Sequence, residues 1–360
     1  MKRALLCSAF AALLTGCGLC PSPPSAATGT AARYPITDVA TAPATPVRNQ
    51  AKSGTCWAFG GVSLIESEAI RTRRCTLDLS EMWVVRHAYF EKAVKYVRTR
   101  GRVAFDQGGE IQDVLWLVDR YGIVPQSLYE GGAADGTYDH ASLAKAIRRL
   151  AKRIVDKKLY EKEHWQRMID EELDRRLGAR PDRFVIDGVA YTPFSYADSI
   201  GFRRDDYIAL TSFTHHPFFE RFVLEIPDNW AAHATLNIPL DSLMRLLDSA
   251  LAAGYTAAWD ADVSERGFGR RAGIALLPQQ EGRITLPAPE IVVDQPLRQR
   301  MFDTQATTDD HVMHIVGTAV DSLGNSYYKV KNSWGERAGR HGYWYASPAY
   351  VCLLYTSPSP

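Results

Sequence analysis

Two segments that lie far apart in the chain carry the side chains of a thiol-based reaction, and any fold must bring them together. The first is VRNQAKSGTCWAF, in which Gln50 precedes Cys56 by six residues. The second comprises DDHVMHIVG at 309–317 and KNSWG at 331–335, which supply a histidine and an asparagine. A thiolate nucleophile, an imidazole base and two amides are the groups that cleave an acyl bond. The pattern therefore predicts an enzyme whose site joins the two ends of the chain.

Cys56 stands at the start of a predicted helix, residues 56–72, in which apolar residues recur at helical spacing. The thiolate is the reactive form of cysteine, and the free amides at a helix N-terminus favour an anion. The preceding residues, 53–55 (SGT), allow a sharp turn into this helix. Gly60 and Gly61 weaken a helix intrinsically, so we expect them to permit close packing against another element.

Two histidines compete for the role of base, His311 and His314. Because residues three apart on a strand point to opposite faces, only one can reach the site. We assign the base to His311 and a packed strand position to His314. Asn332 is expected to orient the imidazole by a hydrogen bond, and Trp334 to cover that contact, exclude water and border the substrate. The Gln50 amide is expected to donate to the oxyanion together with the backbone amide of the nucleophile.

The remaining pattern places helices first and strands later. Helices are predicted over 79–100 and 111–121. Five strands are predicted in the last third of the chain, at 257–259, 273–277, 312–320, 327–330 and 343–346. This order predicts an α+β fold, with a helical N-terminal lobe, an antiparallel β C-terminal lobe and a catalytic cleft between them.

A charged helical region, about 142–177, is predicted to be an insertion that occupies residues 139–180. Its apolar residues repeat at helical spacing, which favours an amphipathic helix pair with one solvated face. The residues expected to pack the pair are Leu150, Ile154, Leu159, Trp165 and Ile169. An alternative is an arm that binds a partner.

Composition narrows the class of protein. The chain has 360 residues, of which 46% are hydrophobic and 23% charged, enough for one large domain or two lobes. Its net charge of +1 gives no electrostatic reason for a nucleic-acid partner. The six cysteines are too sparse for a disulfide framework, although Cys75 and Cys352 could pair in an oxidising compartment.

The N-terminus has the features of an export signal. Lys2 and Arg3 precede a short apolar stretch, which is too short to span a bilayer and ends in Leu-Thr-Gly before Cys17. We predict a lipoprotein signal peptide over residues 1–16, lipidation of Cys17 and an exported, membrane-anchored protein of the cell envelope. An ordinary secretory signal is the alternative. Residues 17–33 are rich in Pro, Ser, Ala and Gly and are predicted to be a flexible tether.

Taken together, VRNQAKSGTCWAF, DDHVMHIVG and VKNSWG resemble the papain-like cysteine peptidases. His311 follows Cys56 by 255 residues, about a hundred more than in papain itself, and Ser53 replaces a disulfide cysteine. Both departures are similar to the bleomycin hydrolase and aminopeptidase C branch. Further segments resemble the form found in Bacteroides-type bacteria, namely LSEMWVVRHAYF, QGGEIQDVLWLVDRYGIVPQ, TSFTHHPFF and WDADVSERGF.

The resemblance covers residues 34–351 and implies a papain-like two-lobe fold that hydrolyses peptide bonds through an acyl-enzyme. It implies that Gly108 and Gly109 line the non-primed cleft, that peptides are the substrates, and that the chains assemble into homo-oligomers. In that branch the chain's own C-terminus blocks the cleft and favours removal of N-terminal residues. Here residues 352–360, CLLYTSPSP, lack the expected pattern and are interpreted as an atypical, non-native tail.

The sequence is therefore compatible with three functions. The favoured one is an aminopeptidase, and the alternatives are an endopeptidase with an open cleft and a non-catalytic binding lipoprotein on the same fold. No cofactor is expected. Adjacent His215 and His216 suggest a metal, but neighbours in sequence rarely converge on one ion and no partner stands at zinc spacing, so we expect no metal there.

Overall fold

The computed structural model describes residues 34–75, 77–103, 105–132, 137–280 and 288–353. The predicted signal peptide, the tether and Cys17 lie outside the described residues, as do residues 354–360. Within the described part of the chain, no helix is both long and apolar enough to cross a bilayer.

Three helices near the start of the described chain form the first core. They are α1 (Cys56–Arg73), α2 (Glu81–Arg98) and α3 (Ile111–Tyr121), each within two residues of the predicted bounds. The Ser80 side chain begins α2 by accepting a hydrogen bond from the Trp83 amide at 3.0 Å, as expected of an N-cap residue. Large side chains such as Trp57, Leu64 and Met82 are fully buried between the helices.

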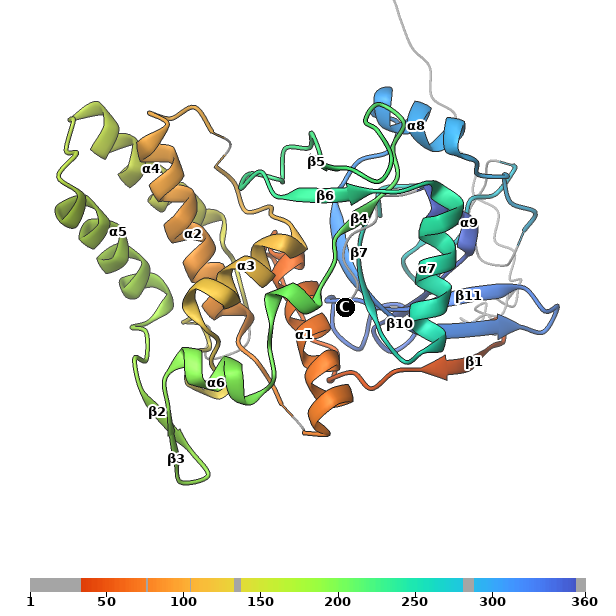
Figure 1. The fold of residues 1–360 in the computed structure, drawn as a ribbon, viewed down its shortest axis with the longest axis horizontal. Helices are drawn as coiled ribbons and strands as arrows, with labels where there is room; N and C mark the ends of the chain where they lie inside the picture. The colour runs from red at the N-terminus through yellow and green to blue at the C-terminus, as the bar shows by residue number, and fades with distance from the viewer. Residues whose placement is uncertain (1–33, 76, 104, 133–136, 281–287, 354–360) are drawn as a thin grey trace, which may run out of the picture. The chain divides into compact units, whose positions relative to one another are not determined.

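The charged region forms two helices, α4 (Ala141–Asp156) and α5 (Lys162–Leu177), which pack beside α2 (Figure 1). Ile154, Trp165 and Ile169 are buried in the first core, whereas Leu150 and Leu159 are only partly buried. The buried Arg86 guanidinium of α2 forms an ion pair with Asp170 of α5 at 3.0 Å and another with Asp174. Apolar packing and these ion pairs therefore hold α5 against α2.

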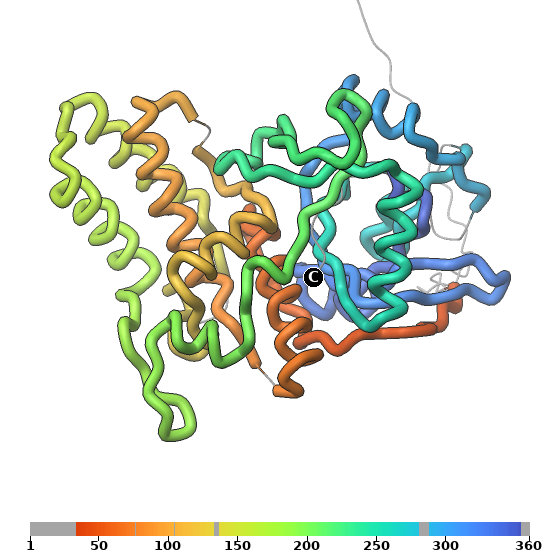
Figure 2. The backbone as a smooth tube through the Cα atoms, in the orientation of Figure 1, coloured from red at the N-terminus to blue at the C-terminus, as the bar shows by residue number. Residues whose placement is uncertain are grey.

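A seven-stranded sheet forms the second half, in the order β1-β10-β11-β12-β9-β8, with β7 also paired to β10. The strands are β1 (Ile36–Thr41), β7 (Ala257–Ala261), β8 (Phe268–Gly269), β9 (Ile274–Ala275), β10 (His311–Asp321), β11 (Ser326–Lys331) and β12 (Tyr343–Ala346). The pairing is antiparallel, as expected, except for a short parallel contact between β12 and β9. Strand β1 was not predicted, and the chain runs from it to α1 (Figure 2).

Strand β10 has β7 along its first half and β1 along its second half on one edge. His311 pairs with Ala261 of β7, and Gly317 pairs with Thr41 of β1. A residue larger than glycine would not fit at position 317, because its Cβ would overlap the Ala40 carbonyl of β1. His311, the first residue of β10, therefore lies beside the last residue of β7.

The sequence did not predict several further helices and small sheets. They are α6 (Pro193–Ser199), α7 (Leu240–Ala252), α8 (Gln295–Asp303), α9 (Pro348–Leu353), the β2–β3 hairpin (Phe184–Ile186 and Val189–Tyr191), and the sheet of β4 (Leu210–Thr211), β5 (Arg221–Val223) and β6 (Ala234–Asn237). Of these, α6 and the β2–β3 hairpin lie with the helices of the first core (Figure 1). Helix α9 continues through Cys352 and Leu353, two residues past the predicted boundary of the tail, and Leu353 is buried. Cys75 and Cys352 are both free thiols, so they do not form the disulfide that the sequence left open.

Helix α1 forms the seam between the helices and the sheet, and its two glycines make the close approach possible. A Cβ at Gly60 would lie 2.6 Å from Cγ1 of Val312 on β10, and a Cβ at Gly61 would lie 2.6 Å from Cγ2 of Val114 on α3. The predicted close packing at these glycines is confirmed. The N-terminus of α1, where Cys56 lies, is consequently held against the start of β10.

Candidate active site

A cleft of about 340 Å³ opens where the N-terminus of α1 meets the start of β10. Among the predicted residues, Gln50, Cys56 and His311 line it together with Gly108 and Gly109. With its other lining residues, the cleft brings together five separate parts of the chain, namely 50–56, 106–109, 228, 260 and 309–312.

Cys56 is the first residue of α1, after the N-cap residue Thr55. The backbone amides of Val312 and Trp57 donate hydrogen bonds toward its sulfur, and both lower the pKa of the thiol. Burial has the larger effect, and with the negative charge of Asp260 and Asp228 it raises the pKa of Cys56 to about 12. The thiolate therefore needs positive charge beside it, from the helix N-terminus and from an imidazolium.

The hydrogen-bond pattern around Asn332 fixes the orientation of His311. Oδ1 of Asn332 accepts a hydrogen bond from the Ser333 amide at 2.6 Å, which identifies that atom as the oxygen. The same oxygen lies 2.7 Å from Nε2 of His311, so Nε2 must carry a proton and donate it. The other ring nitrogen, Nδ1, is then free of a proton and can act as a base toward the cleft.

His311 resists protonation on its own. Burial lowers its pKa to about 4, Arg270 acts in the same direction, and the hydrogen bond to Asn332 opposes both. An imidazolium formed alone at His311 is therefore unfavourable, and so is a thiolate formed alone at Cys56. Transfer of the proton from Cys56 to His311 creates both charges together, and opposite charges attract each other more strongly in a buried site than in water. The opposite charges therefore support each other.

Gln50 lies where its amide can serve an oxyanion. Its Nε2 donates to the Ser53 carbonyl at 2.7 Å, and its Oε1 accepts from the Ser333 hydroxyl at 2.6 Å. These bonds fix the amide and leave the second hydrogen of Nε2 without an assigned acceptor in the described part of the chain. Gln50 and Cys56 line the same cleft, so this hydrogen is available to a substrate oxygen.

Trp334 lies against His311 and does not line the cleft. The two ring centroids are 4.7 Å apart with planes tilted by 34°, and Trp334 also contacts the fully buried Trp344 of β12 at 5.4 Å. It covers the imidazole, as predicted, but among the described residues that border the cleft Trp334 does not appear. The assignment of Trp334 to substrate contact therefore stays a prediction.

The loop that carries the two glycines is tied directly to the Cys56 segment. The Gly54 amide donates to Oε1 of Gln107 at 2.9 Å, and Nε1 of Trp57 donates to the Gln107 carbonyl at 3.0 Å. No function was assigned to Gln107 from the sequence. Its role depends on two residues some fifty positions away, and no local signal identifies it.

His314 is separated from the cleft, which supports the choice of His311. Its Nδ1 lies 2.9 Å from the hydroxyl of Ser63 on α1, so the buried side chain lies between β10 and α1. Burial, helped by the charge of Lys331, holds the pKa of His314 well below its usual range. A neutral, packed histidine is what the alternation of β10 predicted for this position.

From the sequence, no acidic residue was assigned to the active-site cleft. The aspartates that line it are Asp106, Asp228, Asp260, Asp309 and Asp310. Only the DDH run gave a local signal, since Asp309 and Asp310 directly precede His311. Asp228 comes from the turn between β5 and β6, and Asp260 comes from β7.

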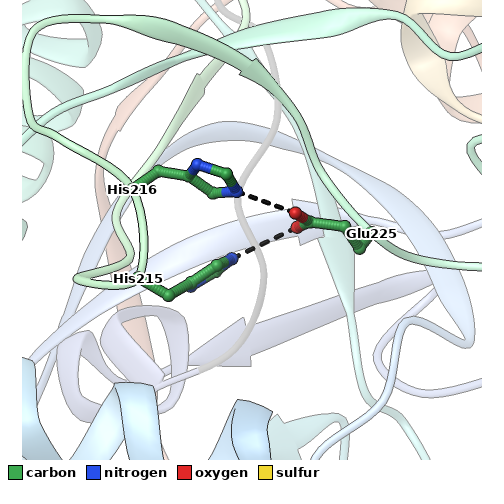
Figure 3. Close-up of side chains that lie close together, drawn as sticks. All are labelled: His215, His216 and Glu225. Atoms are coloured by element: carbon green, nitrogen blue, oxygen red, sulfur yellow. Dashed lines mark hydrogen bonds and ion pairs between the residues drawn. The ribbon is translucent and has the colours of Figure 1, made fainter.

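His215 and His216 converge on a carboxylate, Glu225, at 3.2 Å and 2.7 Å (Figure 3). The expectation that they lack an acidic partner is therefore wrong, because β5 brings Glu225 back beside the loop. Oε1 of Gln299 accepts from the Thr214 amide, so Nε2 of Gln299 faces Nδ1 of His215 at 3.0 Å. Nε2 of His215 then holds a proton for Glu225, and this arrangement fits a hydrogen-bonded loop better than a metal site.

Comparison with known proteins agrees with this geometry. A model of the papain family of cysteine proteases matches residues 35–167, and a model of the Peptidase C1-like family matches residues 186–354. The chain is 24% identical over 347 residues to Aminopeptidase C of Lactococcus lactis subsp. cremoris, a match that covers 85% of this chain and 78% of that protein. It is 25% identical over 366 residues to Aminopeptidase G of Lactobacillus delbrueckii subsp. lactis, with 87% and 81% covered.

The fold is also similar to a solved structure. The crystal structure of PepW from Lactobacillus rhamnosis superimposes with a TM-score of 0.69 at 20% identity, covering 90% of this chain and 81% of that one.

Proposed function

We propose that this chain, which belongs to the papain-like cysteine peptidases and to their aminopeptidase C branch, releases residues from the free N-termini of peptides. The observation that carries the proposal is the single cleft that joins Cys56 at the start of α1 to His311 at the start of β10. The relatives named aminopeptidases support the choice of exopeptidase.

In the proposed acylation step, Nδ1 of His311 takes the thiol proton as Sγ of Cys56 attacks the carbonyl carbon. The oxyanion accepts hydrogen bonds from Nε2 of Gln50 and from the backbone amide of Cys56. The protonated imidazole then gives its proton to the leaving amine as the carbon–nitrogen bond breaks. The products are a thioester on Cys56 and a peptide shortened by its first residue.

Deacylation reverses these roles with water. His311 removes a proton from the water as its oxygen attacks the thioester carbonyl, and the carbon–sulfur bond breaks. Sγ recovers a proton from the imidazolium and the amino acid leaves. Asn332 holds the ring through Nε2 in both steps and touches no reacting atom.

Papain-like endopeptidase activity is the second candidate, and one observation favours it. Ala349 and Cys352 of α9, near the end of the described chain, line a separate cavity of about 800 Å³ on the sheet side. Among the described residues that border the active-site cleft, none lies beyond Val312 in the chain. The described part of the C-terminus therefore leaves the cleft unblocked.

The test compares a free peptide with its N-acetylated form. An aminopeptidase cleaves the free form much faster than the acetylated form, with mass spectrometry showing loss of one residue at a time, whereas equal cleavage of the two forms would reject the proposal. Cys56→Ala is expected to abolish hydrolysis. Cys75→Ala is the matched control, because Cys75 is also a free, partly buried thiol and lies outside the cleft.

We further propose that the enzyme is exported and anchored through a lipid on Cys17. The support is the basic start, the short apolar stretch and the Leu-Thr-Gly-Cys sequence. Metabolic labelling with an alkyne fatty acid should mark the wild-type protein and the Cys20→Ala control but not Cys17→Ala. Label retained in Cys17→Ala would contradict the anchor.

A further inference from the structure

The cleft beside Cys56 is strongly acidic. Of the thirteen residues that line it, five are aspartates and none is a lysine or arginine. Asp309 lies two residues before His311, and Asp260 lies on β7, whose pairing places it opposite Val312. This excess of negative charge surrounds a nucleophile that itself must become an anion. The acylation chemistry alone gives no reason for it.

Glu110 is buried beside these aspartates, and one oxygen of its carboxylate lacks a hydrogen-bond partner among the described residues. Only 5% of Glu110 is exposed, and its Oε1 has no partner in the described structure. Carboxylate oxygens of Glu110, Asp260 and Asp309 all lie within 4.8 Å of one another. Oδ2 of Asp309 is also without a partner. Buried carboxylates this close repel one another, so the cluster must either hold protons or accept a cation.

Lys92 lies near Asp228 and opposes the effect of burial, which raises the pKa of that carboxyl. It donates to the Asp106 carbonyl at 2.7 Å and to the Gly108 carbonyl, which anchors the glycine loop. No lysine or arginine is found among the described residues that line the cleft, so a cation that replaces protons on Glu110, Asp260 and Asp309 would come from a bound molecule.

The carboxylate of Asp228 lies against Gly108, which places a negative charge at this part of the cleft. A Cβ at Gly108 would overlap the Asp228 carboxylate, so the glycine is what allows Asp228 to lie directly on the loop. Gly108 and Gly109 are the residues assigned to the non-primed side. The Asp228 side chain therefore occupies the space in which a longer peptide would continue past the first residue.

We propose that Asp228, Asp260 and Asp309, backed by Glu110, bind the α-ammonium group of the substrate's first residue, and that Asp228 closes the cleft beyond it. The inference rests on the proposed aminopeptidase function and names the groups that would enforce it. In any peptide the α-nitrogen is about 2.5 Å from the carbonyl carbon under attack. The groups that bind this nitrogen must therefore line the cleft beside Cys56. Charge-assisted hydrogen bonds to carboxylates are the strongest available for an ammonium group.

A divalent cation is the competing occupant, because three carboxylate oxygens can also ligate calcium or magnesium. The α-ammonium is favoured because the carboxylates border the cleft itself, where the substrate must bring its first residue. A lysine or arginine side chain at the first position is a further source of positive charge, and the test separates it from the α-amine.

The test measures kcat/KM for leucine and arginine aminomethylcoumarin amides, each with a free and with an N-acetylated amine. Asp228→Asn and Asp260→Asn keep the side-chain shape and remove the charge. We expect each to lower kcat/KM for the free substrates at least tenfold and to leave the acetylated substrates unchanged or improved. Asp119→Asn, which removes an exposed charge on α3, should change neither. Thermal melting checks that every variant is folded.

The outcomes separate the inference from the proposed function. Equal loss on free and acetylated substrates would mean a structural role for the aspartates and would overturn the inference while the aminopeptidase stands. Wild-type enzyme that does not prefer free amines would overturn both. Preference for acetyl-arginine over free leucine would assign the carboxylates to the side chain. Activity lost in EDTA and restored by calcium or magnesium would assign them to a metal.

Discussion

Nε2 of His311 lies 2.7 Å from Oδ1 of Asn332, and the Ser333 amide holds that oxygen in place from the other side. We expect Asn332→Ala to lower kcat by about tenfold or more, because the imidazole loses the partner that selects its tautomer and general acid–base catalysis depends on that tautomer. Asn332→Asp should recover part of the rate, since a carboxylate oxygen also accepts from Nε2. It should also move the acidic limb of the pH–rate profile upward, because the added negative charge favours the imidazolium. Identical profiles for the two variants would contradict this role.

The Gln50 amide is predicted to act only after the carbonyl has been attacked. Gln50→Ala should therefore lower kcat by roughly 10²–10³, with little change in KM, as for loss of one oxyanion donor. Ser333→Ala is the matched control, because it removes a 2.6 Å hydrogen bond to Gln50 but leaves the donor in place. Similar losses in both variants would show that Gln50 matters through packing and not as a donor.

Gly60 is predicted to be required for the seam between α1 and β10. Its Cβ position lies 2.6 Å from Cγ1 of Val312, and overpacking of this kind costs about 1–3 kcal/mol. Alanine is favoured over glycine in a helix by up to about 1 kcal/mol, which offsets part of the cost. We expect Gly60→Ala to lower the free energy of unfolding by about 1 kcal/mol in urea titrations.

The partner of that contact provides the check. In the double variant Gly60→Ala/Val312→Ala the clash is absent, so the two substitutions should couple favourably in a double-mutant cycle. Simple additivity of the two single effects would show that the contact with Val312 does not limit packing at this position.

Activity on free-amine substrates should depend on the charge of the aspartates that line the cleft. Burial, reinforced by neighbouring carboxylates, raises the pKa of Asp309 to about 7 and the pKa of Asp310 to about 6. The charged or titratable groups around these two carboxyls are Asp228, Asp260, Asp262, Glu110 and His311. As the pH falls through about 7, these carboxyls gain protons and no longer attract an ammonium group.

KM for a free-amine substrate is therefore expected to rise below about pH 7, measured by steady-state kinetics across the acidic range. An acetylated substrate reports the titration of His311 alone, since it has no ammonium to bind. A parallel rise of KM for both substrates would show that the cleft aspartates do not cause the pH dependence.

The structure also shows how far local patterns can predict a site. Cys56 at the start of a helix and His311 at the start of a strand were both predicted, because helical spacing and strand alternation are visible in a short window. Their neighbours were harder. Gln107 acts through residues near position 55, and Glu225 reaches the two histidines only because β5 returns beside their loop. Neither contact has a signature in sequence.

The sequence alone determined the chemistry: a cysteine, histidine, asparagine and glutamine in contexts that serve one reaction, on an α+β fold of papain type. Only the tertiary structure decided the surroundings of that chemistry. It paired the unpredicted β1 with β10, separated His314 from the cleft, laid Asp228 on Gly108 and gathered Asp260 and Asp309 beside Cys56. The physical reason is that nucleophile and base are specified by local geometry, whereas an electrostatic environment is the sum of charges that meet only when distant segments pack.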